Sequence, residues 1–373
     1  MLAWLLVPLV AGSCVYGLLV AFAAWRYRAA RPPATLDFPP ITVLKPLAGA
    51  DEGLEENLRS FFIQDYPDFE ILFAVRDSTD PAVHVCESLR AAHPHISSRL
   101  VIAGEPPYPN AKVWSLASMA AEARHDLWVM SDSDVRVTPD CLRTLAAEFR
   151  NPGLALTTCP YRAAPGNSLW SALEAAGMNT EFLGGILVAR LLEGMRFAVG
   201  PTIVARRVTI DAIGGFDRLR DYLAEDFAMG KFAAEAGLGV GLSSYIIEHR
   251  IGSQSFAVNM AHRLRWARST RRSRPSGYAG QVFTNPLPLA LALLVTAPGW
   301  WLLVLIALVV RAVAAWATAG FVLRDPLCAR RWWLVPAQDM LSFVLWIAGF
   351  FGNTIHWRGR RYRLDPGGRF HDV

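Results

Sequence analysis

The chain is apolar at both ends and mixed in between. Residues 3–25 form a run of 23 residues without a charged side chain, and Arg26, Arg28 and Arg31 follow it. A helix of that length crosses the hydrocarbon core of a membrane, and the arginines after it favour the cytoplasmic side. A cleaved signal peptide is the alternative, but such peptides carry a basic residue before a shorter apolar run. The pattern therefore predicts an uncleaved membrane anchor.

Three further apolar segments lie near the C-terminus: Leu287–Val310, Ala312–Leu323 and Trp333–Phe351. The first and third are long enough to span a membrane, whereas the middle one is short and follows Arg311, a costly residue at bilayer depth. Arginines in 324–331 and in 358–363 both favour the cytoplasmic side. Three simple crossings do not satisfy both groups, so the pattern leaves this topology open.

Between the two ends, short apolar runs alternate with amphipathic stretches. Four runs predict buried strands: Ile41–Leu44, Ile71–Val75, Leu100–Ala103 and Leu127–Met130. The stretches that follow them predict helices: Gly53–Phe62, Val83–Ala92, Val113–Ala123 and Pro139–Phe149. This alternation predicts an α/β domain with a mainly parallel sheet that is covered on both faces. In such sheets ligands bind beyond the carboxyl ends of the strands.

A helix break at Arg31-Pro-Pro begins the soluble part. The predicted divisions are an N-terminal transmembrane anchor (1–30), a cytoplasmic domain (31–280), C-terminal membrane segments (281–356) and a basic cytoplasmic tail (357–373).

Composition narrows the class of protein. The hydrophobic content of 53% is high for a soluble protein. The five cysteines are scattered without a C-x-x-C pair, which argues against a disulfide framework or structural zinc and fits a reducing cytoplasm. The net charge of +5 comes from arginine clusters that suit anionic lipid headgroups or a nucleotide diphosphate. Nucleic-acid binding is not expected, because the clusters adjoin membrane-like segments and no nucleic-acid motif is present.

Acidic residues occur at three places where a ligand is expected. Asp77 follows the second predicted strand, and Asp132 and Asp134 follow the fourth. Two carboxylates at i and i+2 on a loop can address a hard cation, which a diphosphate needs to neutralise its charge. The third place is Glu225-Asp226, at the start of a predicted helix. Each has a structural alternative: a loop cap for Asp77 or Asp80, and a helix N-terminus that favours negative charge for the acidic pair.

The segment His262–Trp266 opens an arginine-rich stretch that extends to Arg274. Arginine offers a fork to phosphate and tryptophan a flat apolar face, which together suit a nucleotide diphosphate at a membrane surface. The alternative is a basic amphipathic helix that lies in the interface without contacting substrate. In either case these arginines are expected to dock the domain on anionic headgroups, at about 1 kcal/mol each.

Together these residues resemble the ceramide glucosyltransferase family and the similar bacterial glycosyltransferases of hopanoid lipid synthesis. That group uses the pattern D, D, D, (Q/R)xxRW on a nucleotide-sugar-binding, GT-A-like α/β domain. The matching segments are Val43–Leu47, Gln64–Pro67, Asp77, the region of Lys112, Ser131–Arg136, Ala224–Asp226, Arg265–Trp266 and Trp357–Arg363. Two positions depart from the pattern. His262 replaces the motif's Gln or Arg, so no role is carried over to it, and Asp134 replaces a Gly of the ceramide enzymes, which favours the bacterial lipid enzymes.

The resemblance implies a role for each site. Asp226 would be the general base. The implied donor-site residues are Asp77 at the uracil, Lys112, Asp132 at the ribose and metal, Asp134 at the metal, and Arg265 and Trp266 at the diphosphate or the acceptor entrance. The implied cofactor is a divalent metal, Mn²⁺ or Mg²⁺.

The expected function is inverting transfer of a hexose, glucose or N-acetylglucosamine, from a UDP-sugar to a hydroxyl of a membrane lipid. The acceptor stays open among ceramide, a hopanoid polyol and a diacylglycerol. The expected location is a membrane, the bacterial inner membrane by the resemblance, with the catalytic domain in the cytoplasm. A processive polysaccharide synthase would need more membrane helices, and a non-catalytic scaffold would not need the acidic residues.

Overall fold

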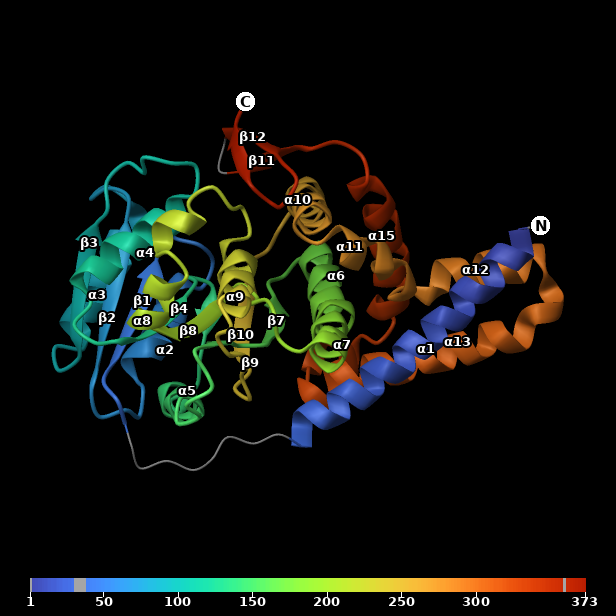
Figure 1. Ribbon diagram of the computed structural model, residues 1–373, viewed down its shortest axis with the longest axis horizontal. Coiled ribbons are helices and arrows are strands. Elements are labelled where there is room, and N and C mark those ends of the chain that lie inside the picture. The colour runs from blue at the N-terminus through green and yellow to red at the C-terminus, as the bar shows by residue number, and fades with distance from the viewer. Residues whose placement is uncertain (1, 30–37, 358–359) are drawn as a thin grey trace.

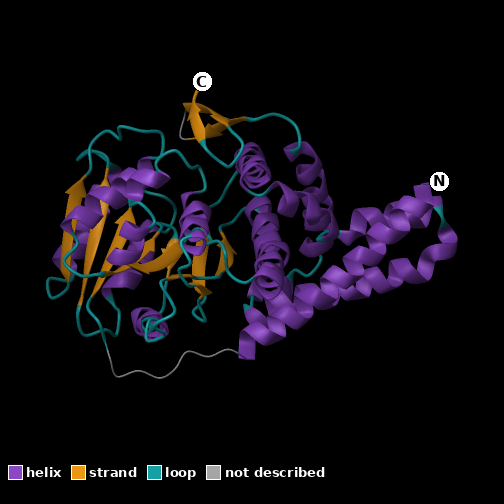
Figure 2. Ribbon diagram, in the orientation of Figure 1, coloured by secondary structure: helices purple, strands orange, loops and turns teal. Residues whose placement is uncertain are grey.

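The computed structural model describes residues 2–29, 38–357 and 360–373 (Figure 1). The predicted helix break at Arg31-Pro-Pro lies outside these residues, as do Arg358 and Gly359 of the last matching segment. An α/β domain occupies one side of the molecule, and a group of long helices extends from the other (Figure 2).

A seven-stranded sheet forms the centre of the α/β domain, with strand order β3-β2-β1-β4-β8-β6-β9. The pairs β1–β2, β1–β4, β2–β3 and β6–β9 are parallel, and only β8 runs antiparallel to its neighbours β4 and β6 in this sheet of the described chain. The four predicted strands and the mainly parallel sheet are therefore confirmed. The strands are β1 (Ile41–Pro46), β2 (Phe69–Val75), β3 (Ser97–Ile102), β4 (Leu127–Ser131), β6 (Leu156–Thr158), β8 (Thr202–Arg206) and β9 (Val240–Leu242).

Helices cover both faces of this sheet because alternate strand residues point to opposite sides. Val43 and Phe73 belong to the core with α2, α3 and α5 on one face. Leu44 and Leu72 belong to the core with α4, α8 and α9 on the other. All seven residues of β2 are buried, as a strand covered on both faces requires. The covering elements are α2 (Leu54–Phe62), α3 (Pro81–Ala92), α4 (Ala111–Glu122), α5 (Cys141–Glu148), α8 (Arg207–Ala212), the 3₁₀ turn η2 (Phe216–Leu219) and α9 (Glu225–Glu235).

A small second sheet and a long helical rod lie beside the central sheet. In the small sheet, β10 pairs antiparallel with β5 and parallel with β7. In the rod, α6 continues through the π-helical segment η1 into α7, and π-helical segments often occur at functional sites. The bounds are β5 (Val135–Arg136), β7 (Tyr161–Pro165), β10 (Ile247–Ile251), α6 (Leu169–Gly177), η1 (Met178–Phe182), α7 (Leu183–Glu193) and α10 (Phe256–Ser273).

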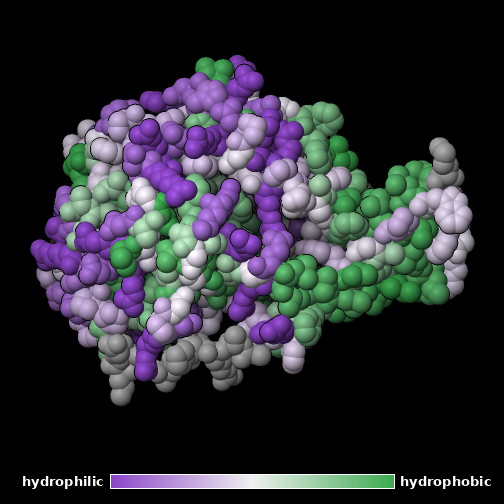
Figure 3. Space-filling model, viewed as in Figure 1, coloured by the Kyte–Doolittle hydropathy of each residue, from purple (hydrophilic) through white to green (hydrophobic). Residues whose placement is uncertain are grey.

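Three apolar helices, α1, α12 and α13, form an arm that extends away from the α/β domain (Figure 1). Its surface is hydrophobic over most of the view in Figure 3. Within the described residues, two helices, Leu2–Arg28 and Pro298–Val322, are long and apolar enough to cross a membrane, and a bent pair around Thr284 would make a third. The bounds are α1 (Leu2–Ala29), α11 (Pro275–Gly280), η3 (Gln281–Phe283), α12 (Pro286–Thr296), η4 (Pro298–Trp300), α13 (Trp301–Ala315) and the π-helical η5 (Trp316–Val322).

The predicted single span Leu287–Val310 is wrong. The chain ends α12, turns at Ala297–Trp300 and then starts α13. Pro298 lacks a backbone N–H and Gly299 lacks a side chain, so both favour a break inside an otherwise apolar run. The segment Ala312–Leu323 is accordingly the end of the α13–η5 helix and no separate element.

The C-terminal segment packs back onto the α/β domain. The predicted membrane segment Trp333–Phe351 forms a helix, α15, but at 16 residues this helix is shorter than the candidate membrane spans among the described residues, and it contacts α6 and α10. A three-stranded antiparallel sheet lies above α10 (Figure 1). Its first strand, Thr354–Trp357, lies almost wholly in the range predicted as membrane segments, and the other two come from the predicted basic tail. The bounds are α14 (Pro326–Arg330), α15 (Leu334–Gly349), β11 (Thr354–Trp357), β12 (Arg360–Leu364) and β13 (Phe370–Asp372).

Candidate active site

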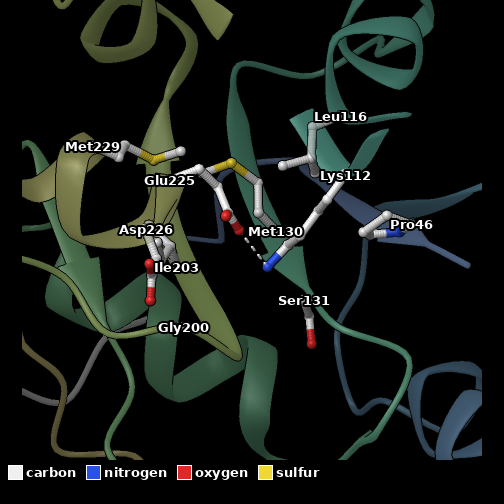
Figure 4. Close-up of a pocket in the computed structure, with 10 residues that line it drawn as sticks. All are labelled: Pro46, Lys112, Leu116, Met130, Ser131, Gly200, Ile203, Glu225, Asp226 and Met229. Carbon is white, nitrogen blue, oxygen red and sulfur yellow. Dashed lines mark ion pairs between the residues drawn. The ribbon is translucent and has the colours of Figure 1, made fainter. Parts of the chain in front are cut away.

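A pocket lies at the carboxyl ends of β1 and β4, where the first turn of α9 approaches the sheet (Figure 4). Its volume is about 270 Å³, including its open mouth. The pocket is lined by Pro46, Lys112, Leu116, Met130, Ser131, Gly200, Ile203, Glu225, Asp226 and Met229. The third acidic place of the sequence, Glu225-Asp226, therefore lies at the edge of the sheet where ligands are expected, and Asp132 of the second is joined to this pocket through Lys112.

Lys112 joins these two acidic places. Its Nζ lies 2.6 Å from Oδ1 of Asp132 and 2.8 Å from Oε1 of Glu225. Burial acts to lower the pKa of Lys112, but the two carboxylates outweigh burial and raise it, so the side chain is a cation. The start of α4 is fixed by Asn110, whose side chain accepts hydrogen bonds from the backbone N–H groups of Lys112 and Val113, both at 3.1 Å.

Asp226 points away from this ion-paired cluster. Figure 4 shows the Glu225 carboxylate reaching Lys112, while that of Asp226 lies beside Gly200. A Cβ atom at Gly200 would come within 3.2 Å of Asp226 Oδ2, so a glycine leaves this approach uncrowded. Burial, together with the charge of Glu225, raises the pKa of Asp226 to about 7. A carboxyl group with this pKa can accept a proton at neutral pH.

Asp132 and Asp134, on the turn between β4 and β5, have different partners. Asp132 is paired with Lys112, whereas Asp134 Oδ2 lies 3.1 Å from Nε2 of His249 on β10. Burial acts to raise the pKa of Asp134, but the charge and hydrogen bond of His249 outweigh burial and lower it. The other carboxylate oxygen, Oδ1 of Asp134, is buried and has no hydrogen-bond partner among the described residues.

This turn offers two carboxylates to a cation. In the described part of the chain, no group of three or more His, Cys, Asp or Glu side chains is arranged to hold a metal. A cation held by Asp132 and Asp134 would therefore take further ligands from a diphosphate and water, as Mg²⁺ commonly does.

Lys45 lies beneath the same turn. It is fully buried in β1, and its Nζ donates hydrogen bonds to the Asp132 carbonyl (2.5 Å) and the Ser131 hydroxyl (3.4 Å). Burial lowers the pKa of Lys45 to about 7. Lys45 directly follows the predicted strand Ile41–Leu44, but in the sequence only the matching segment Val43–Leu47 includes it.

Asp77 lies farther along the sheet edge. It is exposed after β2, and its carboxylate accepts hydrogen bonds from the backbone N–H (2.9 Å) and the hydroxyl of Thr79, which lower its pKa. Because β1 separates β2 from β4, about 10 Å of sheet lies between Asp77 and Asp132. Asp80 has the structural role that was the alternative to ligand binding: it caps a helix. Its side chain accepts a hydrogen bond from the backbone N–H of Ala82 (2.8 Å) at the start of α3.

The motif residues His262, Arg265 and Trp266 lie on α10, outside the lining of this pocket. His262 Nδ1 lies 2.9 Å from Oε1 of the buried Glu174, and its ring packs 4.8 Å from that of Trp266. The Arg265 guanidinium lies over the ring of Trp357, 5.7 Å from its centroid. This contact joins the matching segment Arg265–Trp266 to the one that begins at Trp357.

Several arginines that are expected to dock on anionic headgroups also contact the protein itself. Arg268 donates to the carbonyls of Phe351 (3.1 Å) and Thr354 (2.6 Å), and Arg271 donates to that of Gly352 (2.7 Å). These carbonyls follow the end of α15, where the helix dipole and unpaired carbonyls attract cations. Two further contacts are Arg274 with Glu193 (2.5 Å) and Arg263 with Ser342 (3.3 Å). These contacts hold the four side chains in place, and their docking on anionic headgroups stays a prediction.

Comparison with known proteins identifies the family. The sequence model of glycosyl transferase family 21 matches residues 5–370. The chain belongs to glycosyl transferase family 21. The resemblance to the ceramide glucosyltransferase family is thereby confirmed.

Two relatives of this family 21 protein are ceramide glucosyltransferases. It is 30% identical to ceramide glucosyltransferase 1 of Caenorhabditis elegans over 209 residues, which cover 56% of this chain and 44% of that protein. It is 24% identical to ceramide glucosyltransferase 3 of the same organism over 340 residues, which cover 89% and 74%. The match thus spans less than half of the first relative and about three quarters of the second.

A solved structure supports the fold. The family 21 protein is similar to a mannosyltransferase from Pyrobaculum calidifontis in complex with GDP-Man and Mn²⁺, with a TM-score of 0.53 and 18% identity over 93% of this chain and 99% of that one. At this identity the likeness concerns the fold alone. The GT-A-like fold predicted from the sequence is confirmed.

Proposed function

We propose that this family 21 protein is an inverting glycosyltransferase that transfers a hexose, glucose or N-acetylglucosamine, from a UDP-sugar to the hydroxyl of a membrane lipid. The proposal is carried by Asp226, a carboxyl with a pKa of about 7 in the same pocket as the Lys112 ion pairs. Transfer from a nucleotide diphosphate to a hydroxyl requires a proton acceptor beside a charged donor site. The ceramide glucosyltransferases among the relatives support a lipid acceptor.

The donor is proposed to lie along the carboxyl ends of β2, β1 and β4. Asp77 would contact the uracil, and Asp132 would contact the ribose about 10 Å farther along the edge, two strand spacings away. Lys112, which is paired with two carboxylates, would also donate a hydrogen bond to the diphosphate. Arg265 and Trp266 would act on the acceptor side, because α10 packs against α6 and α15 and does not line the donor pocket.

The turn after β4 fits a divalent cation, Mn²⁺ or Mg²⁺. Asp132 and Asp134 supply hard oxygen ligands, and Oδ1 of Asp134 is buried without a hydrogen-bond partner among the described residues. When bound, the cation would neutralise charge on the diphosphate as its bond to the sugar breaks.

Asp226 would accept the proton of the acceptor hydroxyl as the hydroxyl oxygen attacks the anomeric carbon. The bond from that carbon to UDP breaks in the same displacement, and Lys112 stabilises the charge on the departing diphosphate. A single displacement places the new bond on the face opposite the leaving group, so the configuration is inverted.

The test uses the full chain, purified in detergent, with UDP-glucose and UDP-N-acetylglucosamine. Ceramide, a hopanoid polyol and a diacylglycerol serve as acceptors, and mass spectrometry of the lipids detects added hexose. We expect one donor and one class of lipid to give product, and chelation of divalent cations to abolish it. Absence of any glycolipid and of UDP release, with every donor and acceptor, would refute the proposal.

A further inference from the structure

A carboxylate lies buried between α6 and α10, outside the lining of the donor pocket. Glu174 on α6 is only 4% exposed. A buried charge is costly unless hydrogen bonds replace the water that it loses. Even a paired buried charge is weak evidence for stability, because apolar side chains of similar size often stabilise such a contact as well. The partners of Glu174 therefore indicate what this carboxylate does.

Both oxygens of Glu174 accept hydrogen bonds from α10. Nδ2 of Asn259 donates to Oε2 (2.6 Å), and Nδ1 of His262 lies 2.9 Å from Oε1. A carboxylate only accepts hydrogen bonds, so Nδ1 of His262 carries the proton and donates it. Asn259 and His262 are three residues apart and thus lie on one face of α10. The two hydrogen bonds together fix the rotation of α10 about its own axis against α6.

The ring of His262 also packs against Trp266, one helical turn farther along α10. The two ring centroids are 4.8 Å apart, with 59° between the ring planes. On another side, the Phe182 ring of η1 lies 6.3 Å from that of Trp266. Trp266 is nevertheless only half-buried. Its indole is therefore held by the protein and still has surface that a ligand can contact.

Packed side chains also connect Trp266 to the proposed donor site. The Phe182 ring packs 5.4 Å from that of Tyr161, and the Tyr161 ring packs 5.2 Å from that of His249. Nε2 of His249 in turn binds Asp134 on the turn after β4. Closely packed interiors transmit displacements, so a rotation of α10 would move Trp266 relative to this turn.

The contact with Glu174 requires an N–H donor at position 262. Gln and Arg, which the motif pattern has at this position, share such a donor with His262 and otherwise differ from it in shape and charge. Met has nearly the length of Gln but no N–H group. Substitutions at this position can therefore separate the effect of the hydrogen bond from that of side-chain size.

We propose that Glu174 is a positioning residue for the lipid acceptor, which acts through its hydrogen bond to His262 and so fixes the indole of Trp266 at the acceptor entrance. The inference rests on the proposed function, in which Trp266 acts on the acceptor side. Glu174 itself contacts neither substrate. The flat apolar face of the indole packs against the lipid beside its reacting hydroxyl, and this contact orients the hydroxyl toward Asp226.

The test compares His262→Gln with His262→Met. The full chain, purified in detergent, is assayed with the UDP-sugar and the lipid that the wild type uses. We expect His262→Met to lower kcat/KM for the lipid at least about tenfold, as the loss of a hydrogen bond to a charged group does. His262→Gln should stay within about threefold of the wild type. The KM for the UDP-sugar should be unchanged in both variants, whereas general damage to the fold would weaken both substrates together.

A double-mutant cycle shows whether the effect acts through Glu174. In a Glu174→Met background the carboxylate is absent, so His262→Met should cause little further loss of transfer. The matched control is His371→Met. Nδ1 of His371 also lies 3.1 Å from a carboxylate oxygen, that of Asp365, but this pair is exposed in the C-terminal sheet, so transfer should be unchanged.

The outcomes separate the inference from the proposed function. If His262→Gln loses as much transfer as His262→Met, or if His262→Met causes its full loss again in the Glu174→Met background, the inference is overturned and the proposed function stands. Equal weakening of lipid and UDP-sugar also overturns the inference. If His262→Met does not fold, His262→Asn and His262→Leu repeat the comparison of donor with non-donor. A wild-type protein that transfers to none of the lipids overturns the inference and the proposed function together.

Discussion

Glu225 and Asp226 are adjacent acids with different surroundings. Successive residues of a helix point about 100° apart. At the start of α9, Glu225 therefore meets Lys112 at 2.8 Å, whereas Asp226 turns toward Gly200. The cation satisfies one carboxylate, and burial raises the pKa of the other to about 7. One dipeptide thus provides both an anchor for Lys112 and a candidate base.

Asp226→Asn removes the candidate base and nearly preserves its shape. We expect lipid glycosylation to fall on the order of 100-fold or more, with UDP affinity within a few-fold of the wild type, as for the loss of a general base. Steady-state transfer and UDP binding by calorimetry measure the two effects. Asp217→Asn is the control, because Asp217 is an exposed carboxylate that pairs with Arg220. Equal transfer by the Asp226 variant and the wild type would remove Asp226 from the mechanism.

The pKa of Asp226 also predicts how transfer depends on pH. A base acts only when deprotonated, and the raised pKa keeps Asp226 protonated below about pH 7. The value of kcat/KM should therefore rise with pH and level off above about 7, because this quantity reports ionisation of the free enzyme. Rates measured across that range check the rise, and the residual activity of Asp226→Asn should lack it. A wild-type profile that is flat through neutral pH would contradict the assignment.

The sequence predicted the acidic residues of the site and Lys112, but not which side chains pair with one another. Asp132 and Asp134 follow a predicted strand, and Asp226 is at the start of a predicted helix. The positions of these acidic residues could therefore be predicted from the local sequence. Lys45 and His249 could not, because each meets the turn after β4 only through the folded sheets.

At the scale of elements, a glycine sets the position of α9. A Cβ at Gly230 would lie 2.1 Å from the backbone nitrogen of Ala198 and 2.3 Å from the carbonyl carbon of Phe197. Both are backbone atoms, so no side-chain rotation relieves the contact. The depth of this packing fixes the first turn of α9, which carries Glu225 and Asp226.

Gly230→Ala should therefore displace α9 from the sheet edge. We expect a stability loss of about 1–3 kcal/mol, as for overpacked cores. Transfer should fall at least about tenfold, because the catalytic groups are misplaced. Thermal unfolding in detergent and the lipid assay measure the two effects. The control is Gly280→Ala in α11, where an added Cβ meets no atom within 4 Å. If both variants match the wild type, close packing at Gly230 is not what positions the site.

Elements were predictable where one local pattern dominates. The runs that became β1, β2 and β4 are short, apolar and buried, whereas β3, predicted as buried, is an edge strand in which only Val101 is buried. The run Leu287–Val310 is uniformly apolar, so hydropathy alone gives no boundary within it. The structure breaks this run at Pro298-Gly299. These two residues favour a break through their backbone properties, which a count of apolar residues does not register.

At the scale of the whole molecule, this break resolves the conflict between the arginine groups. With a turn at Ala297–Trp300, α12 leads away from the domain and α13 leads back, so the turn lies at the far end of the arm near the start of α1 (Figure 1). The other ends of α1 and α13–η5 meet, since the Arg28 guanidinium lies 5.9 Å from the Phe321 ring centroid. Arg324 follows directly after η5. Both basic ends thus lie on the domain side, as the positive-inside rule favours.

This arrangement predicts that the α12–α13 turn lies across the membrane from the α/β domain. Gly299→Cys on the turn should react with a membrane-impermeant maleimide in intact bacterial cells, and an added Cβ there meets no atom within 4 Å. Ala91→Cys, on the exposed side of α3, should react only after permeabilisation. The background carries Cys14→Ser and Cys328→Ser, because the other native cysteines are buried. If Gly299→Cys also requires permeabilisation, the arm enters and leaves on the domain side as a re-entrant hairpin. The hydrophobic surface of the arm would then insert into one leaflet without crossing the bilayer.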